Sequence, residues 1–200
     1  MIRNTAVTVC GPLNVNKLGV TYVHEHLMVK PQLPDEYYIP YTLDDEAAST
    51  EETRSFSAAG GETLVEMTPI NYGRNVKAYQ RIAQATGVHV ICCTGFHKQL
   101  FMPPWFGDKT DGELYDILMD EVTNGLDDTE IHPGVIKLGT SFEEVTAAEK
   151  RSIEAVARVH RDTGIPISTH CDKGTMGMDQ LRLLEKHGVD PKNVLLCHID

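Results

Sequence analysis

Short apolar runs and amphipathic stretches alternate along this chain, and glycine or proline often separates them. The run at 88–94 is almost continuously apolar, which is typical of a strand that is covered on both faces. The repeated order of strand, loop and helix predicts a parallel sheet with helical crossovers. Six such runs are predicted to be the core strands, at 19–27, 62–68, 88–94, 134–138, 165–170 and 193–198.

Helical spacing of apolar residues fills most of the intervals between these runs. Thr42 is expected to cap the first helix, and Thr146 with Glu149 forms a capping-box pattern before the fourth. The predicted helices cover about 43–59, 76–86, 113–124, 146–163 and 176–187. Glycines are expected to end four of them, at Gly60, Gly87, Gly164 and Gly188. A hairpin strand is expected at 5–10 and a long loop at 97–111.

Two architectures satisfy this element order, a doubly wound open sheet and a (β/α)8 barrel. The glycine-rich dinucleotide turn of the first is missing after the strand at 19–27, where a His-Glu-His sequence stands instead. Polar residues lie at the C-terminal ends of the first, fourth, fifth and sixth strands, which is where a barrel carries its active site. The sequence therefore favours an α/β fold of the (β/α)8 TIM-barrel type. The 200 residues would cover about strands one to six of such a barrel, and they are expected to form a single domain over 1–200.

Composition narrows the choice of partner and compartment. The net charge of −11 disfavours nucleic acid and anionic membranes as partners, and no stretch approaches the ~20 apolar residues of a membrane span. A small-molecule substrate is the expected partner. The five cysteines form no C-x-x-C motif, so reduced thiols in a cytoplasmic protein are the simpler interpretation. Cys171 and Cys197 are expected to face outward, beneath the covering helices.

Four histidines fall at the ends of predicted strands. His24 and His26 are two residues apart on the first strand, so both side chains should point to one face. His170 ends the fifth strand and His198 ends the sixth. A single histidine is more often a hydrogen-bonded core residue than a ligand. Four at equivalent places in a barrel could instead reach a common metal site.

Lys137 lies in a fourth strand that is otherwise valine, isoleucine and leucine. A buried ammonium group is costly and tends to lose its proton. The neutral amine can then react with carbon dioxide to form a carbamate, a carboxylate-like group able to bridge two metals. A catalytic or salt-bridged lysine without modification is the alternative, and spacing does not decide between the two.

The combined motifs resemble the phosphotriesterase family of the amidohydrolase superfamily, and they cover nearly the whole chain. The first is the segment 19–27, which reads G-V-T-Y-V-H-E-H-L, and a second is G-R-N at 73–75. Further matches surround Lys137 in G-V-I-K-L-G-T-S, His170 in P-I-S-T-H and His198 in V-L-L-C-H. The likeness is nearest to the phosphotriesterase-homology and sugar-lactonase branches.

This resemblance implies a binuclear metal hydrolase. His24 and His26 would hold the more buried metal, His170 and His198 the more exposed one, and a carbamylated Lys137 would bridge them and serve as the catalytic residue. Zinc is the expected metal, and manganese, cobalt or iron would also suit nitrogen and oxygen ligands. The family completes its site with an aspartate on strand eight, which this sequence does not reach. Since barrels typically need ~250 residues, we expect a longer enzyme, and the resemblance suggests a homodimer.

Substrate residues are sought in the loops that follow the strands. The candidates are Tyr72, Arg74, His97, Lys98 and Lys173. Lys98 and Lys173 indicate an anionic substrate such as a phosphorylated sugar lactone. The alternative is that both are ordinary solvated lysines. Arg74 could equally have a structural role and connect its loop to the next helix. The main hypothesis is a lactonase. An organophosphate hydrolase of the phosphotriesterase type and a non-catalytic metal-binding homologue are the alternatives.

Overall fold

The computed structural model describes residues 4–32 and 42–199, which fall into two compact units. The first unit comprises Met1–Thr68, Tyr72–Cys93 and Asn124–Gly134, and the second comprises Pro69–Asn71, Thr94–Thr123 and Val135–Asp200. The sequence crosses between the units several times, so neither is one continuous stretch of chain. The expectation of a single domain stays a prediction.

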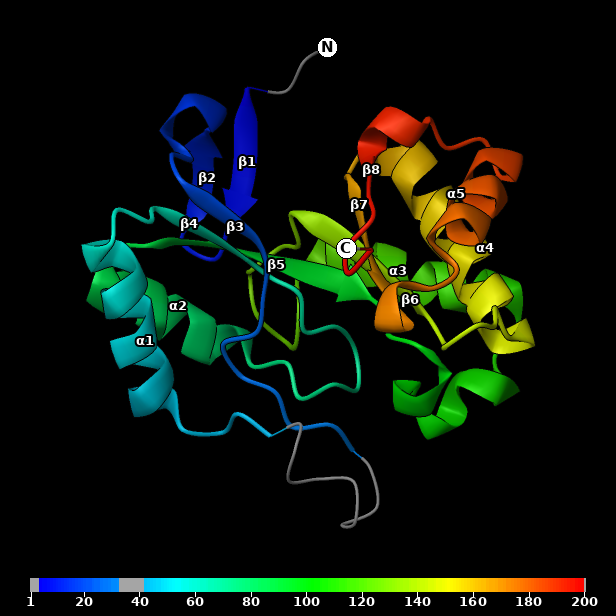
Figure 1. The fold of residues 1–200 in the computed structure, drawn as a ribbon, viewed down its shortest axis with the longest axis horizontal. Coiled ribbons are helices and arrows are strands. Elements are labelled where there is room, and N and C mark those ends of the chain that lie inside the picture. The colour runs from blue at the N-terminus through cyan, green and yellow to red at the C-terminus, as the bar shows by residue number, and fades with distance from the viewer. Residues whose placement is uncertain (1–3, 33–41, 200) are drawn as a thin grey trace. The chain divides into compact units, whose positions relative to one another are not determined.

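Three parallel strands form the sheet of the first unit (Figure 1). Their sheet order follows the sequence: β3 (Thr21–Glu25), β4 (Thr63–Glu66) and β5 (His89–Gly95). The expected hairpin is present as an antiparallel pair, β1 (Thr5–Thr8) with β2 (Gly11–Asn14). The Val9 N–H donates to the Val90 carbonyl at 2.8 Å, which ties the hairpin to β5.

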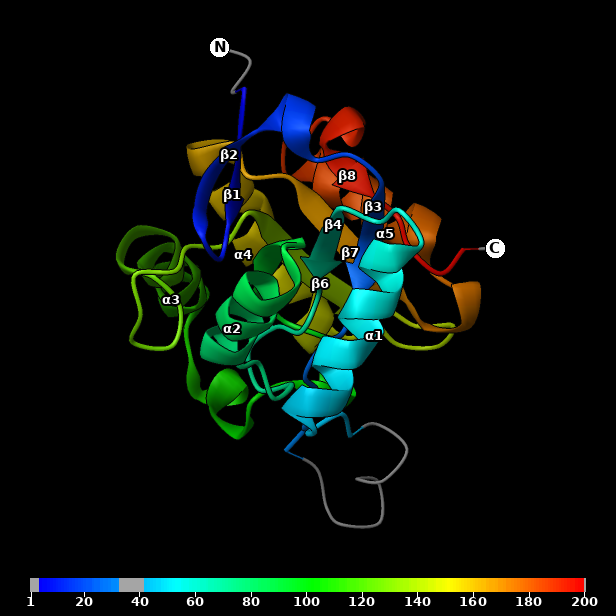
Figure 2. The ribbon, with the colours of Figure 1, turned by 90° about the vertical axis from the view of Figure 1, so that its left-hand side faces the viewer.

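Two helices of the first unit, α1 (Glu46–Ala58) and α2 (Val76–Thr86), lie side by side (Figure 2). Helix α2 has the predicted bounds, begins at an Asn75 cap and ends at Gly87 with a φ of 77°. The predicted start of α1 was wrong. Thr42 does not cap it, because the Asp45 carboxylate accepts hydrogen bonds from the Ala47 and Ala48 N–H groups and fixes the helix start three residues later.

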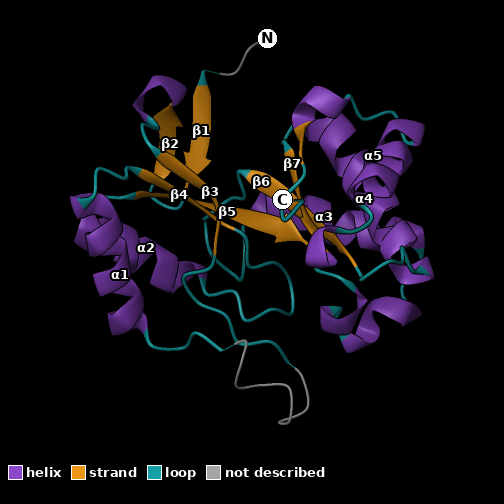
Figure 3. Cartoon of the chain, viewed as in Figure 1, coloured by secondary structure: helices purple, strands orange, loops and turns teal. Residues whose placement is uncertain are grey.

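The second unit repeats the alternation of strand and helix (Figure 3). The last two residues of β5 belong to it and are followed in the sheet by β6 (Val135–Thr140), β7 (Ile167–Cys171) and β8 (Val194–Leu195). Its helices are α3 (Asp111–Asn124), α4 (Ala147–Thr163) and α5 (Gly177–Lys186). Within the described ranges, no helix is long and apolar enough to cross a membrane.

Local signals explain most of the element bounds in this unit. The capping box of Thr146 and Glu149 is formed, and α4 ends at Gly164 with a φ of 72°. The predicted loop at 97–111 contains two 3-10 turns, Gln99–Phe101 and Pro104–Asp108, each of which buries one phenylalanine. Strand β8 has only two residues, so His198 lies beyond its end rather than on it, with a φ of 60°.

Each unit has an apolar core between its strands and helices. In the second unit, β5 and β6 approach closely at Gly95, whose φ is 112° and whose missing Cβ would lie 2.0 Å from the Lys137 carbonyl oxygen. No residue with a side chain fits there. Cys171 is buried as expected, with its Sγ 3.6 Å from the Gln180 side-chain oxygen on α5.

Candidate metal centre and substrate residues

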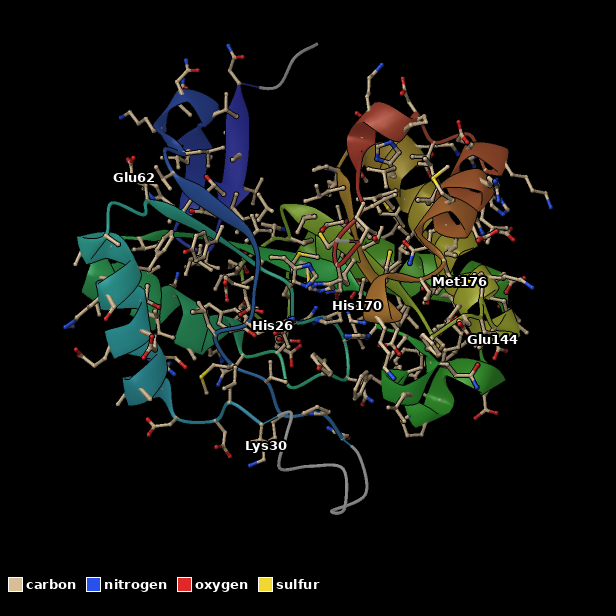
Figure 4. The ribbon with its side chains drawn as sticks, in the orientation of Figure 1. His26, Lys30, Glu62, Glu144, His170 and Met176 are labelled. Carbon is tan, nitrogen blue, oxygen red and sulfur yellow. The ribbon has the colours of Figure 1, made fainter. Side chains whose placement is uncertain are left out.

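The first histidine pair lies at the end of β3 in the first unit. The His24 and His26 ring centroids are 5.4 Å apart, and the pairing of β3 with β4 shifts register between Tyr22 and Glu25, the interval that contains His24. Figure 4 labels His26 immediately beyond the strand. The His26 Nδ1 atom is 2.8 Å from the Thr68 hydroxyl oxygen. That contact orients the imidazole ring through its Nδ1 atom.

Glu66 is a buried carboxylate beside this pair that the sequence interpretation missed. It ends β4 with no exposed surface, accepts a hydrogen bond from the Leu27 N–H, and accepts another from the Thr68 N–H at 2.7 Å. One of its oxygens is 3.9 Å from His26 Nδ1. The signal that could have identified it is the one used for Lys137, a charged residue inside an apolar strand.

Lys137 lies in the middle of β6 and is fully buried, and the other residues of that strand are buried as well. Its backbone carbonyl accepts a hydrogen bond from the Phe96 N–H at 3.2 Å. The expected burial of the side chain is therefore observed.

Three imidazoles form a row in the second unit. The His170 ring centroid is 4.5 Å from that of His97 and 5.0 Å from that of His198. His170 lies on β7, where Figure 4 labels it. Burial lowers the pKa of His170 to about 3, and the positive charges of Lys137, His198 and Lys98 act in the same direction. Its ring is therefore neutral at pH 7.

An ion pair lies next to this row. The Lys98 ammonium donates to Asp172 at 2.6 Å, with both side chains mostly buried, and the other Asp172 oxygen is 3.8 Å from His170 Nε2. Burial raises the pKa of Asp172, but the hydrogen bond and positive charge of Lys98 outweigh it, so the pKa lies below its usual value. Sequence interpretation missed Asp172, because the segment C-D-K-G after His170 resembles an ordinary polar loop.

The remaining substrate candidates have different surroundings. Tyr72 is buried, with its ring centroid 5.7 Å from that of His26. The Lys173 ammonium lies 4.8 Å from the centroid of the Phe142 ring, and the Lys173 backbone has a φ of 49°. Both stay predicted substrate residues.

The Arg74 side chain is bound to other protein groups through several hydrogen bonds. Its guanidinium donates to both Asp127 oxygens, at 3.0 and 2.6 Å, and to the Cys93 carbonyl at 3.2 Å. Its side chain is 5% exposed. These contacts match the structural role that the sequence left open, in which Arg74 ties its loop to neighbouring elements.

A cavity of about 650 Å³ opens in the first unit between β3 and α1. His26 is the one predicted site residue that lines it, together with apolar and acidic side chains such as Tyr22, Phe56 and Glu52. The described lining does not include Tyr72 or Arg74. Among the described residues, neither predicted substrate residue of this unit lines the cavity.

The predicted metal ligands lie in two groups, one in each unit. Among residues 4–32 and 42–199, no group of three or more His, Cys, Asp or Glu side chains is arranged to hold a metal ion. Within the second unit, however, His170 Nε2 is buried and makes no hydrogen bond to any described residue. A neutral imidazole with an uncommitted nitrogen is a good ligand for zinc. His170 therefore suits a metal, and the ligand roles of all five predicted residues stay predictions.

Comparison with known proteins gives consistent matches over almost the whole chain. A model of the phosphotriesterase family matches residues 4–200. The chain is 34% identical to the phosphotriesterase homology protein of Escherichia coli, over 94% of this chain and 64% of that protein. It is 31% identical to a phospho-furanose lactonase of Mycoplasmopsis synoviae, over 100% of this chain and 61% of the relative.

Solved structures give the same result. A lactonase from Listeria monocytogenes superposes with a TM-score of 0.92 and 30% identity, over 98% of this chain and 65% of that one. The Escherichia coli protein, crystallised with phosphate in its active site, superposes with a TM-score of 0.87. The predicted α/β fold, a TIM barrel of which this chain carries six parallel strands, is confirmed. The chain spans between 61% and 65% of the length of these relatives.

Proposed function

The chain belongs to the phosphotriesterase family, and from this premise we propose that the protein is a metal-dependent hydrolase that opens the ring of a sugar or phosphorylated-sugar lactone. The observation that carries the proposal is the burial of Lys137 together with the uncommitted Nε2 of His170. A lysine without exposed surface and a neutral, buried imidazole are costly features for a stable fold. A metal that used both residues would offset that cost.

Five residues are proposed to hold two divalent cations, with zinc as the first choice. They are His24, His26, His170, His198 and a carbamylated Lys137. Their use as one set is inferred from family membership. When bound, the cations would polarise the scissile carbonyl group and supply a nucleophile from water near neutral pH. The carbamate would change the charge of Lys137 from positive to negative, which suits a residue between two cations.

The protein's own side chains are proposed to position and recognise the substrate. Lys98 and Asp172 form a mostly buried ion pair beside His170. A substrate phosphate could compete with Asp172 for the Lys98 ammonium, because phosphate is a strong partner for a lysine charge. Asp172 would then keep Lys98 ordered when no substrate is bound. Lys173, on the adjacent loop, would add a second positive charge.

Support for a phosphorylated lactone comes from the relatives. One is named a phospho-furanose lactonase, and the Escherichia coli homologue holds phosphate in its active site. Those properties belong to the relatives, and their transfer to this protein is our proposal. Organophosphate hydrolysis is the second candidate function, favoured by the family itself. A non-catalytic metal-binding protein is the third.

A substrate panel tests the proposal. The protein, loaded with zinc in bicarbonate buffer, would be assayed against a phosphorylated sugar lactone, the same lactone without phosphate, and a paraoxon-type triester. We expect the highest kcat/KM for the phosphorylated lactone, and a Lys98→Ala variant should lose this preference through a higher KM. Faster hydrolysis of the triester would favour the second candidate. Bound metal without hydrolysis of any substrate would favour the third.

A further inference from the structure

Glu149 is a fully buried carboxylate for which the proposed chemistry has no role. It lies in the first turn of α4, where it completes the capping box with Thr146. Its Oε2 atom accepts a hydrogen bond from the Thr146 N–H at 2.8 Å. A helix N-terminus stabilises a negative charge, so burial of this carboxylate is tolerated. Helix capping alone would not require complete burial, because most capping residues are exposed to solvent.

The second oxygen of Glu149 makes contacts outside its own helix. Oε1 accepts a hydrogen bond from the Gln99 N–H at 3.0 Å and another from the Ser141 hydroxyl at 2.6 Å. Gln99 belongs to the loop after β5, and Ser141 directly follows β6. One carboxylate oxygen therefore joins the segments that leave two neighbouring strands of the second unit.

The loop after β5, which Glu149 holds at Gln99, carries two of the predicted substrate residues, His97 and Lys98. The Lys98 N–H donates to His97 Nδ1 at 2.7 Å, and the next N–H along the chain, that of Gln99, donates to Glu149. The Lys98 N–H thus orients the His97 ring, and the Gln99 N–H holds the loop backbone to Glu149. The same backbone directs the Lys98 ammonium to Asp172.

We propose that Glu149 is a positioning residue for substrate recognition: its carboxylate holds the backbone at Gln99 so that His97 and Lys98 are presented beside His170. The recognition role rests on the proposed function, whereas the positioning role does not. Ser141 anchors the carboxylate from the adjacent segment, so that the oxygen that receives the Gln99 N–H keeps a fixed place.

Two variants remove the hydrogen bond between the Gln99 N–H and Glu149, which we call the tether, one from each partner. Glu149→Ala removes the acceptor. Gln99→Pro removes the donor and leaves Glu149 in place. Proline is compatible with position 99, because Gln99 is the first residue of a 3-10 turn and Lys98 before it is extended, with φ −59° and ψ 162°. The matched control is Gln99→Ala, which loses the same exposed side chain but keeps the N–H.

The direct readout is hydrogen exchange of the Lys98 amide, followed by NMR. In Glu149→Ala and Gln99→Pro we expect exchange to accelerate roughly 10- to 100-fold, the factor associated with losing a hydrogen bond to a charged acceptor. Gln99→Ala should match the parent protein. If Lys98 exchange in Gln99→Pro equals that in Gln99→Ala, the tether does not position the loop and the inference is overturned.

A second control separates positioning from helix capping. Thr146→Ala removes the hydroxyl that accepts the Glu149 N–H, and so weakens the start of α4 without touching the bond to Gln99. Lys98 exchange should stay close to the parent rate in this variant. An acceleration as large as that of Glu149→Ala would assign the effect to the helix start and would contradict the proposal.

Steady-state kinetics test the recognition role separately from the positioning role. In Gln99→Pro we expect KM for the phosphorylated lactone to rise several-fold relative to Gln99→Ala, with a smaller change in kcat. If the parent protein hydrolyses no lactone, the proposed function fails, while the exchange data still decide whether Glu149 positions the loop. If KM is unchanged although Lys98 exchange is faster, the recognition role is refuted.

Discussion

At the scale of single residues, buried polar groups carry most of the information. Lys137 could be singled out from sequence, because a charge inside a run of aliphatic residues needs an explanation. Glu66 in T-L-V-E carries the same signal, a charged residue within a short apolar strand. Asp172 and Glu149 could not be found in this way. Their partners, Lys98 and Gln99, are distant in sequence, and only the folded backbone brings them together.

Stability of the metal-free protein should depend on pH through His170. Its folded pKa is about 3, whereas the unfolded value is near 6.5, so only the unfolded state takes up the proton in that interval. The free energy of unfolding should therefore fall as pH decreases from 6.5 toward 3, by up to about 1.4 kcal/mol per pH unit. Urea unfolding at pH 7.0 and 5.5 measures the change. A His170→Gln variant with the same pH dependence as the parent would contradict this assignment.

Arg74 should matter for stability whether or not it contacts substrate. Arg74→Lys cannot reproduce the two bonds to Asp127 together with the bond to the Cys93 carbonyl. We expect it to lower the free energy of unfolding by about 1–3 kcal/mol. Arg182→Lys is the control, because Arg182 is exposed and contacts only Asp179 among the ion pairs described, and should change stability by less than about 0.5 kcal/mol. Equal effects of the two substitutions would refute the structural role.

At the scale of elements, the sequence was a good guide wherever a local signal fixed an end. Helix α2 and the capping box of α4 match because Gly87, Thr146 and Glu149 act on adjacent residues. The start of α1 was misplaced because Thr42 and Asp45 are both good caps, and sequence could not tell which would be used. Strand β8 is shorter than its apolar run, since pairing with β7 involves only two residues.

Two glycines should respond very differently to substitution by alanine. Both have a positive φ, but Gly87 faces open space, whereas a Cβ at Gly95 would meet the Lys137 carbonyl oxygen at 2.0 Å. Gly87→Ala should cost about 1 kcal/mol from backbone strain alone. Gly95→Ala should cost on the order of 3 kcal/mol or more, because two strands must also move apart. Thermal unfolding compares them, and similar losses would show that the close approach at Gly95 is not needed.

At the scale of the whole molecule, the fold class followed from element order and from the polar residues at strand ends. The likeness to lactonase structures supports that interpretation. The candidate site was predicted less completely. The ring centroids are 5.4 Å apart in the pair of His24 and His26 and 5.0 Å apart in the pair of His170 and His198. The proposed role of Lys137 depends on a covalent modification, which neither the sequence nor the fold displays.

Metal stoichiometry tests that role most directly. The protein would be loaded with zinc in bicarbonate buffer, separated from free metal by gel filtration, and analysed for zinc beside a Lys137→Met variant, whose side chain keeps the buried apolar stem. We predict about two zinc ions per chain for the parent and at most one for the variant, since only the parent can form a bridging carbamate. Two zinc ions retained by a folded Lys137→Met protein would contradict the account.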